Sequence, residues 1–430
     1  MSVWPARLLG DIADESGGDI RTGPFGSQLH RHDYTDSSDG VPVVMPVNMV
    51  GGRVNGDAIA KVSPRKAVEM SAHATRTGDV LLSRRGDIGR YCLIDAASAG
   101  ALCGTGSMRV SIQGSELMPE YFCLFLETSA GLHELQGKAV GSTMPNINSS
   151  IVRSLELPVP PRSTQSKIVG ISSAYDDLIT NNNRRIKLLE EMAQRIYREW
   201  FVNFRFPGHE GVRMVESELG PIPEGWEIRP IGDCFKIVGG ATPSTTRPEF
   251  WEVGTINWYT PSDLTDHKEM FISRSQRKIT GVGLDNCSAR LFPAGSVMMT
   301  SRATLGVRAV NTEEACTNQG FITCLPNDRA SAYRIYFWMG ENLERIIGLA
   351  SGATFKEISK RVFRTIPFLM PPEGIEQRFV ATVRPSLDLV RNRIQANQTL
   401  KFMRDLLLPK LISGQLDVSD LDIDLGQQVA

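Results

Sequence analysis

Three arginine residues occupy matching turns in the two halves of the sequence. Arg84 and Arg85 follow the apolar run 79–82 (DVLL), and Arg302 follows the run 296–299 (SVMM). An arginine at the end of a strand can donate to O6 and N7 of guanine or to a phosphate oxygen. A solvated or ion-paired surface arginine is an equally simple interpretation of each. The three residues are therefore candidate contacts to a nucleic acid.

Three carboxamide residues, Gln28, Asn48 and Gln319, are candidates for contacts to bases, because an amide can bond adenine through two hydrogen bonds. The alternative for each is a loop residue with local hydrogen bonds. A further set precedes the two long apolar stripes of the chain and has side chains that could contact phosphate: Ser142, Thr143, Asn146, Asn148, Thr354, Lys356, Lys360 and Arg361. Capping of the next helix explains the Ser, Thr and Asn residues equally well.

Known catalytic motifs are missing from the sequence. It contains no G-x-x-x-x-G-K-[ST] motif, and the pairs Pro160-Pro161 and Pro371-Pro372 lack the preceding Asn or Asp of an adenine methyltransferase. No arrangement of acidic residues resembles a nuclease centre, and the seven cysteines form no C-x-x-C pair. We therefore expect no catalytic residue and no bound metal. The net charge of −1 predicts weak, salt-sensitive DNA binding unless a partner adds positive surface.

The chain repeats itself. Residues 169–201 match residues 380–412 in pattern without a gap, so that residue 201 aligns with residue 412 at an offset of 211. The match extends upstream through Trp4 and Trp226, the runs 77–89 and 294–306, and the two Pro-Pro pairs. A period this long indicates duplicated domains rather than a solenoid.

Both repeats end in a long amphipathic helix. Apolar residues recur at spacings of three and four over residues 163–203 and 373–411, which predicts two helices with one apolar face each. Asn182 and Asn397 interrupt these faces, as polar residues do when they fix the register of paired helices. We expect the helices to pair antiparallel, and Pro385 to kink the second helix or delay its start. Trp200 and Phe201 would either pack between the helices or dock a partner.

The rest of each repeat has short β-type runs in the middle and helices at the end, which indicates an α+β fold. The predicted organisation is two similar α/β domains separated by a two-helix antiparallel coiled coil, with a pseudo-two-fold internal repeat. The expected boundaries are 1–155 for the first domain, 156–218 for a helix and linker, 219–370 for the second domain, 371–415 for the second helix, and 416–430 for a flexible acidic tail. We find neither a signal peptide nor a membrane-spanning stretch and expect a cytoplasmic protein.

Several motifs resemble those of one known family, the specificity subunits of type I restriction-modification systems. They are, in order along the chain, the residues PP…Q…IV at 160–169, DDLI…N at 176–182, WFVNF at 200–204, GPIPEGW at 220–226 and RDLLLPKLISG at 404–414. The resemblance covers essentially the whole chain.

The resemblance implies a function. Each α/β domain would be a target recognition domain that reads one half of a bipartite sequence in double-stranded DNA. The helices would set the distance between the halves and dock two modification subunits, which bind S-adenosylmethionine and methylate adenine. Two motor-nuclease subunits, with ATP and Mg, would complete a restriction enzyme. The chain itself would bind no cofactor. A protein-binding coiled-coil adaptor and a nuclease with a centre hidden in loops are the alternatives.

Overall fold

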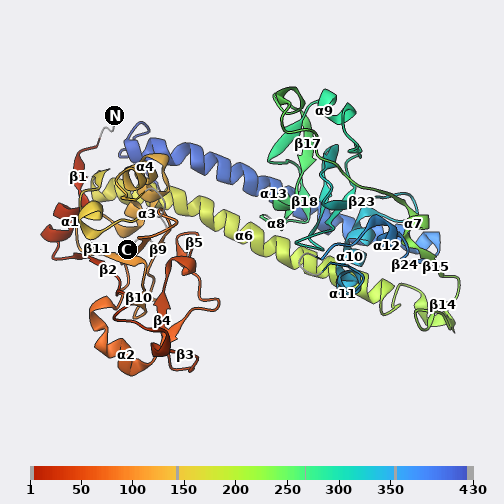
Figure 1. The fold of residues 1–430 in the computed structure, drawn as a ribbon, viewed down its shortest axis with the longest axis horizontal. Helices are drawn as coiled ribbons and strands as arrows, with labels where there is room; N and C mark the ends of the chain where they lie inside the picture. Colours follow the sequence, from red (N-terminus) through yellow and green to blue (C-terminus); the bar gives the residue numbers. More distant parts are fainter. Residues whose placement is uncertain (1–3, 142–144, 267, 353–355, 424–430) are drawn as a thin grey trace. The chain divides into compact units, whose positions relative to one another are not determined.

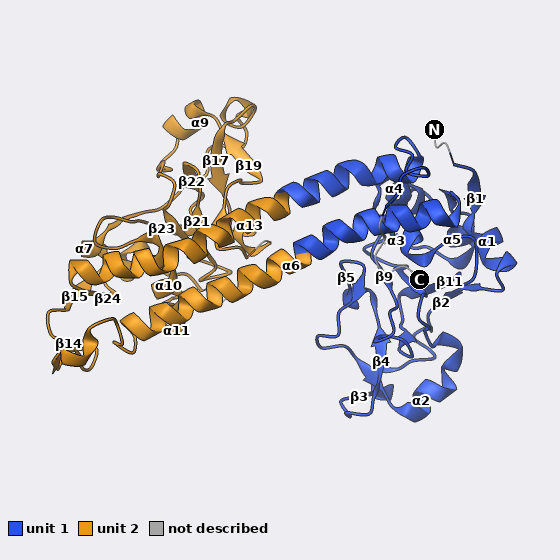
Figure 2. Ribbon diagram, turned by 180° about the vertical axis from the view of Figure 1, so that it is seen from behind, with its two compact units in different colours: residues 1–179, 399–430 blue, residues 180–398 orange. Residues whose placement is uncertain are grey.

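The computed structural model describes residues 4–141, 145–266, 268–352 and 356–423. The chain forms two compact units, which Figure 2 shows in different colours: unit 1 comprises residues 1–179 and 399–430, and unit 2 comprises residues 180–398. Two long helices, α6 (Arg162–Phe201) and α13 (Glu373–Ser413), contribute residues to both units (Figure 1). The predicted mixture of helices and sheets is confirmed.

Unit 1 contains two four-stranded sheets and two short strand pairs, one of which is β5 (Met49–Val50) with β6 (Arg53–Val54). One sheet has the order β2-β11-β8-β9 and the other β10-β4-β7-β3, while β1 pairs antiparallel with β12. The strands are β1 (Ala6–Leu8), β2 (Asp19–Thr22), β3 (Tyr34–Thr35), β4 (Val41–Val44), β7 (Lys61–Val62), β8 (Val80–Ser83), β9 (Tyr91–Leu93), β10 (Leu102–Cys103), β11 (Ser107–Ser111) and β12 (Glu156–Pro158). The helices that accompany them are α1 (Leu9–Glu15), α3 (Pro119–Glu127), α4 (Ser129–Gly137) and α5 (Ser149–Arg153).

Unit 2 has corresponding sheets in which the shared strands keep the same order, with one strand more in the first sheet (β18) and one fewer in the second. They are β16-β23-β20-β21-β18 and β19-β17-β22, with β15 paired antiparallel to β24. The strands are β15 (Glu227–Pro230), β16 (Lys236–Val238), β17 (Ile256–Tyr259), β18 (Phe271–Ile272), β19 (Arg277–Ile279), β20 (Val297–Thr300), β21 (Arg308–Asn311), β22 (Ala315–Thr317), β23 (Phe321–Leu325) and β24 (Pro367–Met370). Its helices include α7 (Ile231–Cys234), α10 (Ala332–Glu341), α11 (Leu343–Gly348) and α12 (Lys360–Arg364).

The pairings agree in direction as well as in order. In unit 1, β4 pairs parallel to β10 and antiparallel to β7; in unit 2, β17 pairs parallel to β22 and antiparallel to β19. The strands expected near residues 41–45, 79–82, 256–259 and 296–299 all form, each within one residue of the expected position. Successive apolar side chains of these strands are buried, most completely in β8 and β20. A strand that is covered on both faces does not need an alternation of apolar and polar residues.

Each expected domain-closing helix is broken in two. The sequence predicted single helices near residues 119–135 and 332–349, but α3 ends before Thr128 and α10 before Asn342. The hydroxyl of Thr128 accepts a hydrogen bond of 3.0 Å from the amide of Gly131 and so caps the start of α4. The break turns the chain so that both short helices pack on the same sheet.

The start of each long helix is held by a hydrogen bond between a buried side chain and a backbone amide. The buried Gln165 in α6 accepts a hydrogen bond of 2.8 Å from the amide of Met118, just before α3. The buried Glu376 in α13 accepts one of 2.9 Å from the amide of Ser331, just before α10. Glu376 also forms a buried ion pair with Arg334. Each helix start thereby supplies an acceptor to an amide at the start of a neighbouring helix.

Segments of α6 and α13 lie side by side within each unit and run antiparallel. In unit 2, Asn182 bonds Asn397, and Phe201 at the other end of the segment packs edge-on against Phe379 at a centroid distance of 4.9 Å. In unit 1, Arg404 forms an ion pair of 2.6 Å with Asp176. Apolar residues of both helices are part of the core of each unit.

The late start expected for the second helix does not occur, and part of the tail is packed. Helix α13 begins at Glu373 and continues through Pro385, so its start is not delayed. Val383 and Leu387, on either side of this proline, are fully buried, and their packing offsets the lost backbone hydrogen bond. The tail packs at residues 418 and 419: Val418 is buried, and Lys167 donates a hydrogen bond of 2.5 Å to the carbonyl of Ser419. Residues 424–430 lie outside the described part of the chain.

Candidate nucleic-acid interface

In unit 1, strand β8 leads directly into a turn that carries Arg84 and Arg85. The amide of Arg84 donates to the carbonyl of Gly106 at 2.8 Å, and the carbonyl of Arg84 accepts from the amide of Ile147 at 3.0 Å. Arg85 forms an isolated antiparallel bridge with Asn146. The end of β8 is therefore held between the turn before β11 and the segment before α5.

Unit 2 builds the same arrangement from different residues. The amide of Ser301 donates to the carbonyl of Gly320 at 2.8 Å, and its carbonyl accepts from the amide of Ile358 at 2.9 Å. Arg302 forms the antiparallel bridge here, with Glu357. Arg302 is thus the structural counterpart of Arg85, Ser301 that of Arg84, and Glu357 that of Asn146.

The backbone after each arginine turns through a left-handed residue. Gly86 has φ 75° in unit 1, and Ala303 has φ 58° in unit 2. An alanine in this region carries a strain of about 1 kcal/mol that a glycine does not. Such strain is tolerated where the surrounding contacts fix the backbone, and it is often found at functional sites. The turn with Ala303 is therefore held by its surroundings.

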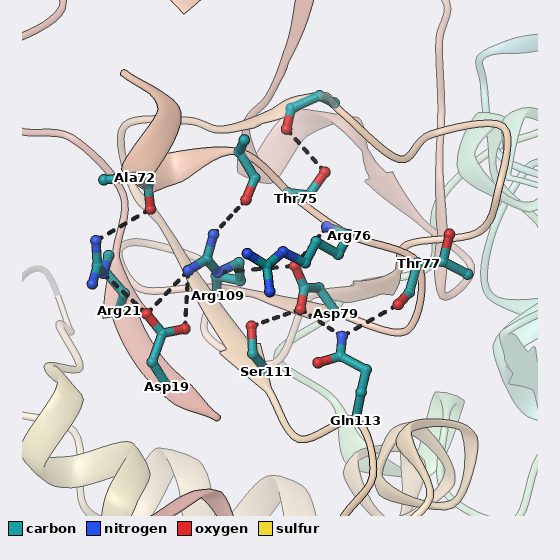
Figure 3. A network of polar contacts seen from close by, with 12 residues as sticks. Asp19, Arg21, Ala72, Thr75, Arg76, Thr77, Asp79, Arg109, Ser111 and Gln113 are labelled. Carbon is teal, nitrogen blue, oxygen red and sulfur yellow. Dashed lines mark hydrogen bonds and ion pairs between the residues drawn. The ribbon is translucent and has the colours of Figure 1, made fainter. Parts of the chain in front are cut away.

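A buried polar network fixes the start of β8 (Figure 3). Asp79 is fully buried and accepts hydrogen bonds from the amide of Arg76 at 2.7 Å, from Ser111 at 2.6 Å and from Gln113 at 2.7 Å. Arg109, on the same strand as Ser111, bonds both carboxylate oxygens of Asp19 at 2.9 and 3.0 Å. The network ties β2, β8 and β11 together, so the turn at the far end of β8 starts from a rigid strand.

The two arginines of unit 1 have opposite environments. Arg85 is exposed, whereas Arg84 is only 6% exposed. Among the described residues, the Arg84 guanidinium has no acidic partner and no hydrogen-bond acceptor, and its Nε is buried. Its one side-chain contact of note is the ring of Phe25, whose centroid lies 5.3 Å from Cζ. Burial, and then the positive charge of Arg85, lower the pKa of Arg84.

In unit 2, several of the predicted residues lie close together. Arg302 is half-buried, and Gln319 is exposed and accepts a hydrogen bond of 2.7 Å from Thr242. Lys360 passes so close to Gly239 that a side chain at that glycine would collide with its Nζ. Lys356 and Arg361 are exposed on either side of this lysine. The structure thus brings cations and an amide from four separate segments to one edge of the unit.

A model of the family described as "Type I restriction modification DNA specificity domain" matches residues 42–191 and 223–398. The chain belongs to this family. It is 36% identical, over 190 residues, to the MjaIX type I restriction enzyme specificity subunit of Methanocaldococcus jannaschii; that match covers 43% of each chain. It is 24% identical to the HindI specificity subunit of Haemophilus influenzae over 404 residues, which cover 80% of this chain and 87% of that protein.

A crystal structure of the type I restriction-modification S subunit from M. genitalium matches 96% of this chain and 96% of that chain, with a TM-score of 0.54 and 15% identity. This likeness supports the fold. Together with the family match and the relatives, it confirms the resemblance to type I specificity subunits that the sequence motifs indicated.

Some residues predicted for this specificity subunit are placed elsewhere. Asn48 is buried; its Oδ1 accepts from the amide of Met45 at 3.0 Å, so it stabilises its own loop and is not presented to bases. Gln28 is exposed but bonds the amide of Phe25 at 3.1 Å. The amide of Ile151 donates to Asn148 at 2.8 Å, so Asn148 caps α5. Ser142, Thr143 and Thr354 lie outside the described residues.

The prediction that Trp200 and Phe201 dock a partner of the specificity subunit is wrong, because both are buried inside unit 2. Phe201 packs against Trp226 and Phe379, and Trp200 also contacts Phe379. Aromatic residues at a helix end are ambiguous in a sequence, since packing and docking both favour them.

Sequence reasoning also missed two residues at the site, Phe25 and Thr242. Both lie in the glycine-rich turns 22–27 and 239–244, at equivalent positions. An exposed phenylalanine within a turn of Gly, Pro and Ser is the signal that marks Phe25, because such turns rarely need an aromatic side chain. In the described part of the subunit, no helix is apolar enough over a sufficient length to cross a bilayer, and no group of three His, Cys, Asp or Glu residues is arranged for a metal ion.

Proposed function

We propose that the two units of this DNA specificity subunit are duplicated target recognition domains, each reading one half of a bipartite sequence in double-stranded DNA. The observation that supports this best is the equivalence of Arg85 and Arg302. Arg85 follows β8 and Arg302 follows β20, which are equivalent strands of equivalent sheets. Each arginine is bridged to the segment before a short helix, and the turn after each ends at a glycine, Gly89 or Gly306. Two related sites suit two separated stretches of one duplex.

The differences between the units fit two different half-sites. Where unit 1 has Arg84, unit 2 has Ser301, and where unit 1 has Asn146, unit 2 has Glu357. Arginine prefers guanine and asparagine prefers adenine, while glutamate accepts a hydrogen bond from cytosine. A changed side chain on an unchanged backbone frame therefore alters which base the site prefers.

The helices α6 and α13 would form an antiparallel two-helix coiled coil that sets the distance between the half-sites and docks two modification subunits. A helix of 40 residues, such as α6, is about 60 Å long. With Trp200 and Phe201 buried, the docking surface would consist of the exposed apolar side chains of the two helices. These are Leu178, Leu188, Met192, Leu389, Phe402, Met403 and Leu406.

The subunit would have no catalytic activity of its own and would act within a cytoplasmic complex. S-adenosylmethionine would be bound by the modification subunits, and ATP and Mg by two motor-nuclease subunits where these are present. The missing nucleotide-binding and methyltransferase motifs support this division of labour. A coiled-coil adaptor without DNA specificity is not favoured by the family match.

Reconstitution with the modification subunits of the same system tests the proposal. The complex should methylate adenines in one split sequence, and the isolated chain should cleave no DNA with Mg. Residues 219–370 are then replaced by the equivalent segment of a relative. The relative should have an arginine at the position of Arg334, because Glu376 lies outside the exchanged segment and needs that counter-charge. One half of the target should change and the other should stay. A change in both halves, or methylation without sequence preference, would contradict the proposal.

A further inference from the structure

Arg84 is a buried cation that no acidic side chain balances within the described part of the chain. Only 6% of the residue is exposed, its Nε is buried without a partner, and no carboxylate among the described residues pairs with it. Burial of an arginine without hydrogen bonds or a counter-charge is unfavourable. Elsewhere in the chain a buried arginine is fully supported: Arg334 bonds two backbone carbonyls at 2.8 and 2.9 Å and pairs with Glu376. Among the described residues, Arg84 therefore lacks the carbonyl acceptors and the counter-charge that support Arg334.

The ring beside Arg84 is unusually placed as well. Phe25 is 54% exposed, although its apolar surface would be more stable in the interior. It lies in the turn 22–27, where Gly23 approaches the backbone of Gly104 so closely that no side chain could fit there. This contact fixes the turn 22–27 against the connection between β10 and β11, and the ring centroid of Phe25 lies 5.3 Å from Cζ of Arg84. A ring in this position limits the orientation of the guanidinium plane.

Unit 2 has neither member of the pair. Ser301 replaces Arg84, and Thr242, which bonds Gln319, replaces Phe25. The arginine that is bridged to the segment before a short helix, by contrast, is present in both units, as the exposed Arg85 and the half-buried Arg302. A contact to the phosphate backbone is needed by both units, whereas a contact to a base must differ between units that read different sequences. The distribution of residues therefore separates the two roles.

We propose that Arg84 reads a guanine in the half-site of unit 1, and that Phe25 is the positioning residue that aligns its guanidinium. The inference rests on the proposed function of the two units. The two parallel N–H donors of the guanidinium match O6 and N7 of guanine, so bound DNA would supply acceptors that the described residues do not offer to Arg84. Unit 2 has neither the arginine nor the ring. Recognition of its half-site should therefore not depend on an aromatic side chain in the turn 239–244.

The test selects preferred targets from a randomised DNA library with the reconstituted complex, using the wild-type chain and the variants Arg84→Lys, Phe25→Leu and Thr242→Ala. Arg84→Lys keeps the charge but loses the planar fork, and Phe25→Leu keeps apolar bulk but loses the ring. Each should reduce the preference for guanine at one position of one half-site, roughly 5- to 150-fold for Arg84→Lys and less for Phe25→Leu. The other half-site should stay as in the wild type. Thr242→Ala is the matched control and should leave this guanine unaffected.

Other outcomes would overturn the inference in distinct ways. Uniformly weaker binding to all sequences, with a salt dependence reduced by about one phosphate, would assign Arg84 to the DNA backbone. Unchanged preferences would show that it makes no contact. If the wild-type complex itself shows no split preference, the proposed function fails and the guanine contact falls with it. A split preference without a guanine in either half refutes the guanine contact alone.

A stability measurement separates this role from a structural one. Replacing Arg84 by methionine removes the unbalanced charge and keeps most of the side-chain volume. The thermal midpoint of Arg84→Met should equal or exceed that of the wild type, while the guanine preference is lost. A clear fall in the midpoint would mean that Arg84 stabilises the fold and would contradict the inference.

Discussion

Asn182 and Asn397 bond each other in the interior of unit 2, with a distance of 2.8 Å from Nδ2 of Asn182 to Oδ1 of Asn397. Nδ2 of Asn397 donates in turn to Asn183 at 2.8 Å. The two asparagines align α6 and α13 at one register, because a shift of either helix would leave both amides buried without partners.

Replacement of Asn397 by leucine should lower the free energy of unfolding by about 1 to 3 kcal/mol, because the amide of Asn182 loses its acceptor. The double variant Asn182→Leu with Asn397→Leu should recover most of this loss, since two apolar side chains can pack without unpaired groups. Urea unfolding measures both, and Asn181→Leu at an exposed position is the control. Additive losses in the double variant would show that the two asparagines do not act as a pair.

Glu376→Ala should destabilise the protein by about 3 to 5 kcal/mol, because Arg334 would remain buried without its counter-charge. Glu376→Gln retains an acceptor for the amide of Ser331 and should cost less. Asp388→Ala removes a half-exposed ion pair with Arg391 and should cost under about 1 kcal/mol. Thermal unfolding compares the three. Equal effects of Glu376→Ala and Asp388→Ala would contradict the importance of the buried pair.

Arg85→Ala and Arg302→Ala should each weaken DNA binding by the complex on all sequences alike. If each arginine contacts one phosphate, the slope of log affinity against log salt concentration should fall by about one in each variant. Titration of labelled DNA at several salt concentrations measures this slope. Arg65→Ala, which removes an exposed arginine paired with Glu69, provides a control on the surface. A sequence-dependent loss in either variant would instead indicate base contact.

Glu190 makes unit 2 sensitive to pH. Burial, and to a lesser degree the charge of Glu269, raise the pKa of Glu190 to about 7, while Arg308 and the backbone of Met270 act in the opposite direction. The folded state therefore holds this proton to a higher pH than the unfolded state, and the contribution of Glu190 to stability falls as the pH rises from about 4.5 to about 7.

Glu190→Gln should consequently be more stable than the wild type at pH 8, by about 1 to 2 kcal/mol, and equal to it near pH 5. The difference between the two unfolding free energies isolates this residue from other titrating groups. Glu191→Gln, at the exposed neighbouring position, should show no such trend. A wild type that is more stable than Glu190→Gln at pH 8 would contradict the burial of this carboxylate.

Much of the fold could be predicted from the sequence. The ends of α6 and α13 are within two residues of the expected ranges, since apolar spacing over forty residues leaves little freedom. The break between α3 and α4 could not, because it depends on one cap at Thr128 and on packing against a distant sheet. Local periodicity does not contain that information.

The site was predictable in kind and less so in detail. The similar apolar runs 79–82 and 296–299 indicated that Arg85 and Arg302 are equivalent, and the backbone hydrogen bonds agree with this. Whether a polar residue in a loop faces solvent was beyond sequence reasoning: Asn48 is buried, and Arg84 is covered by Phe25, which lies 59 residues earlier in the chain. Such burial depends on segments that are close only after folding.

The charged pair at the start of α13 has a consequence for hybrid genes. Recombination between codons 334 and 376 with a relative that lacks this pair would separate Arg334 from Glu376 and leave one ion buried in an apolar interior. Gln165, at the corresponding place in unit 1, is neutral and needs no such cation. Viable hybrids should therefore either cross over outside this interval or join two parents that both carry the arginine and the glutamate.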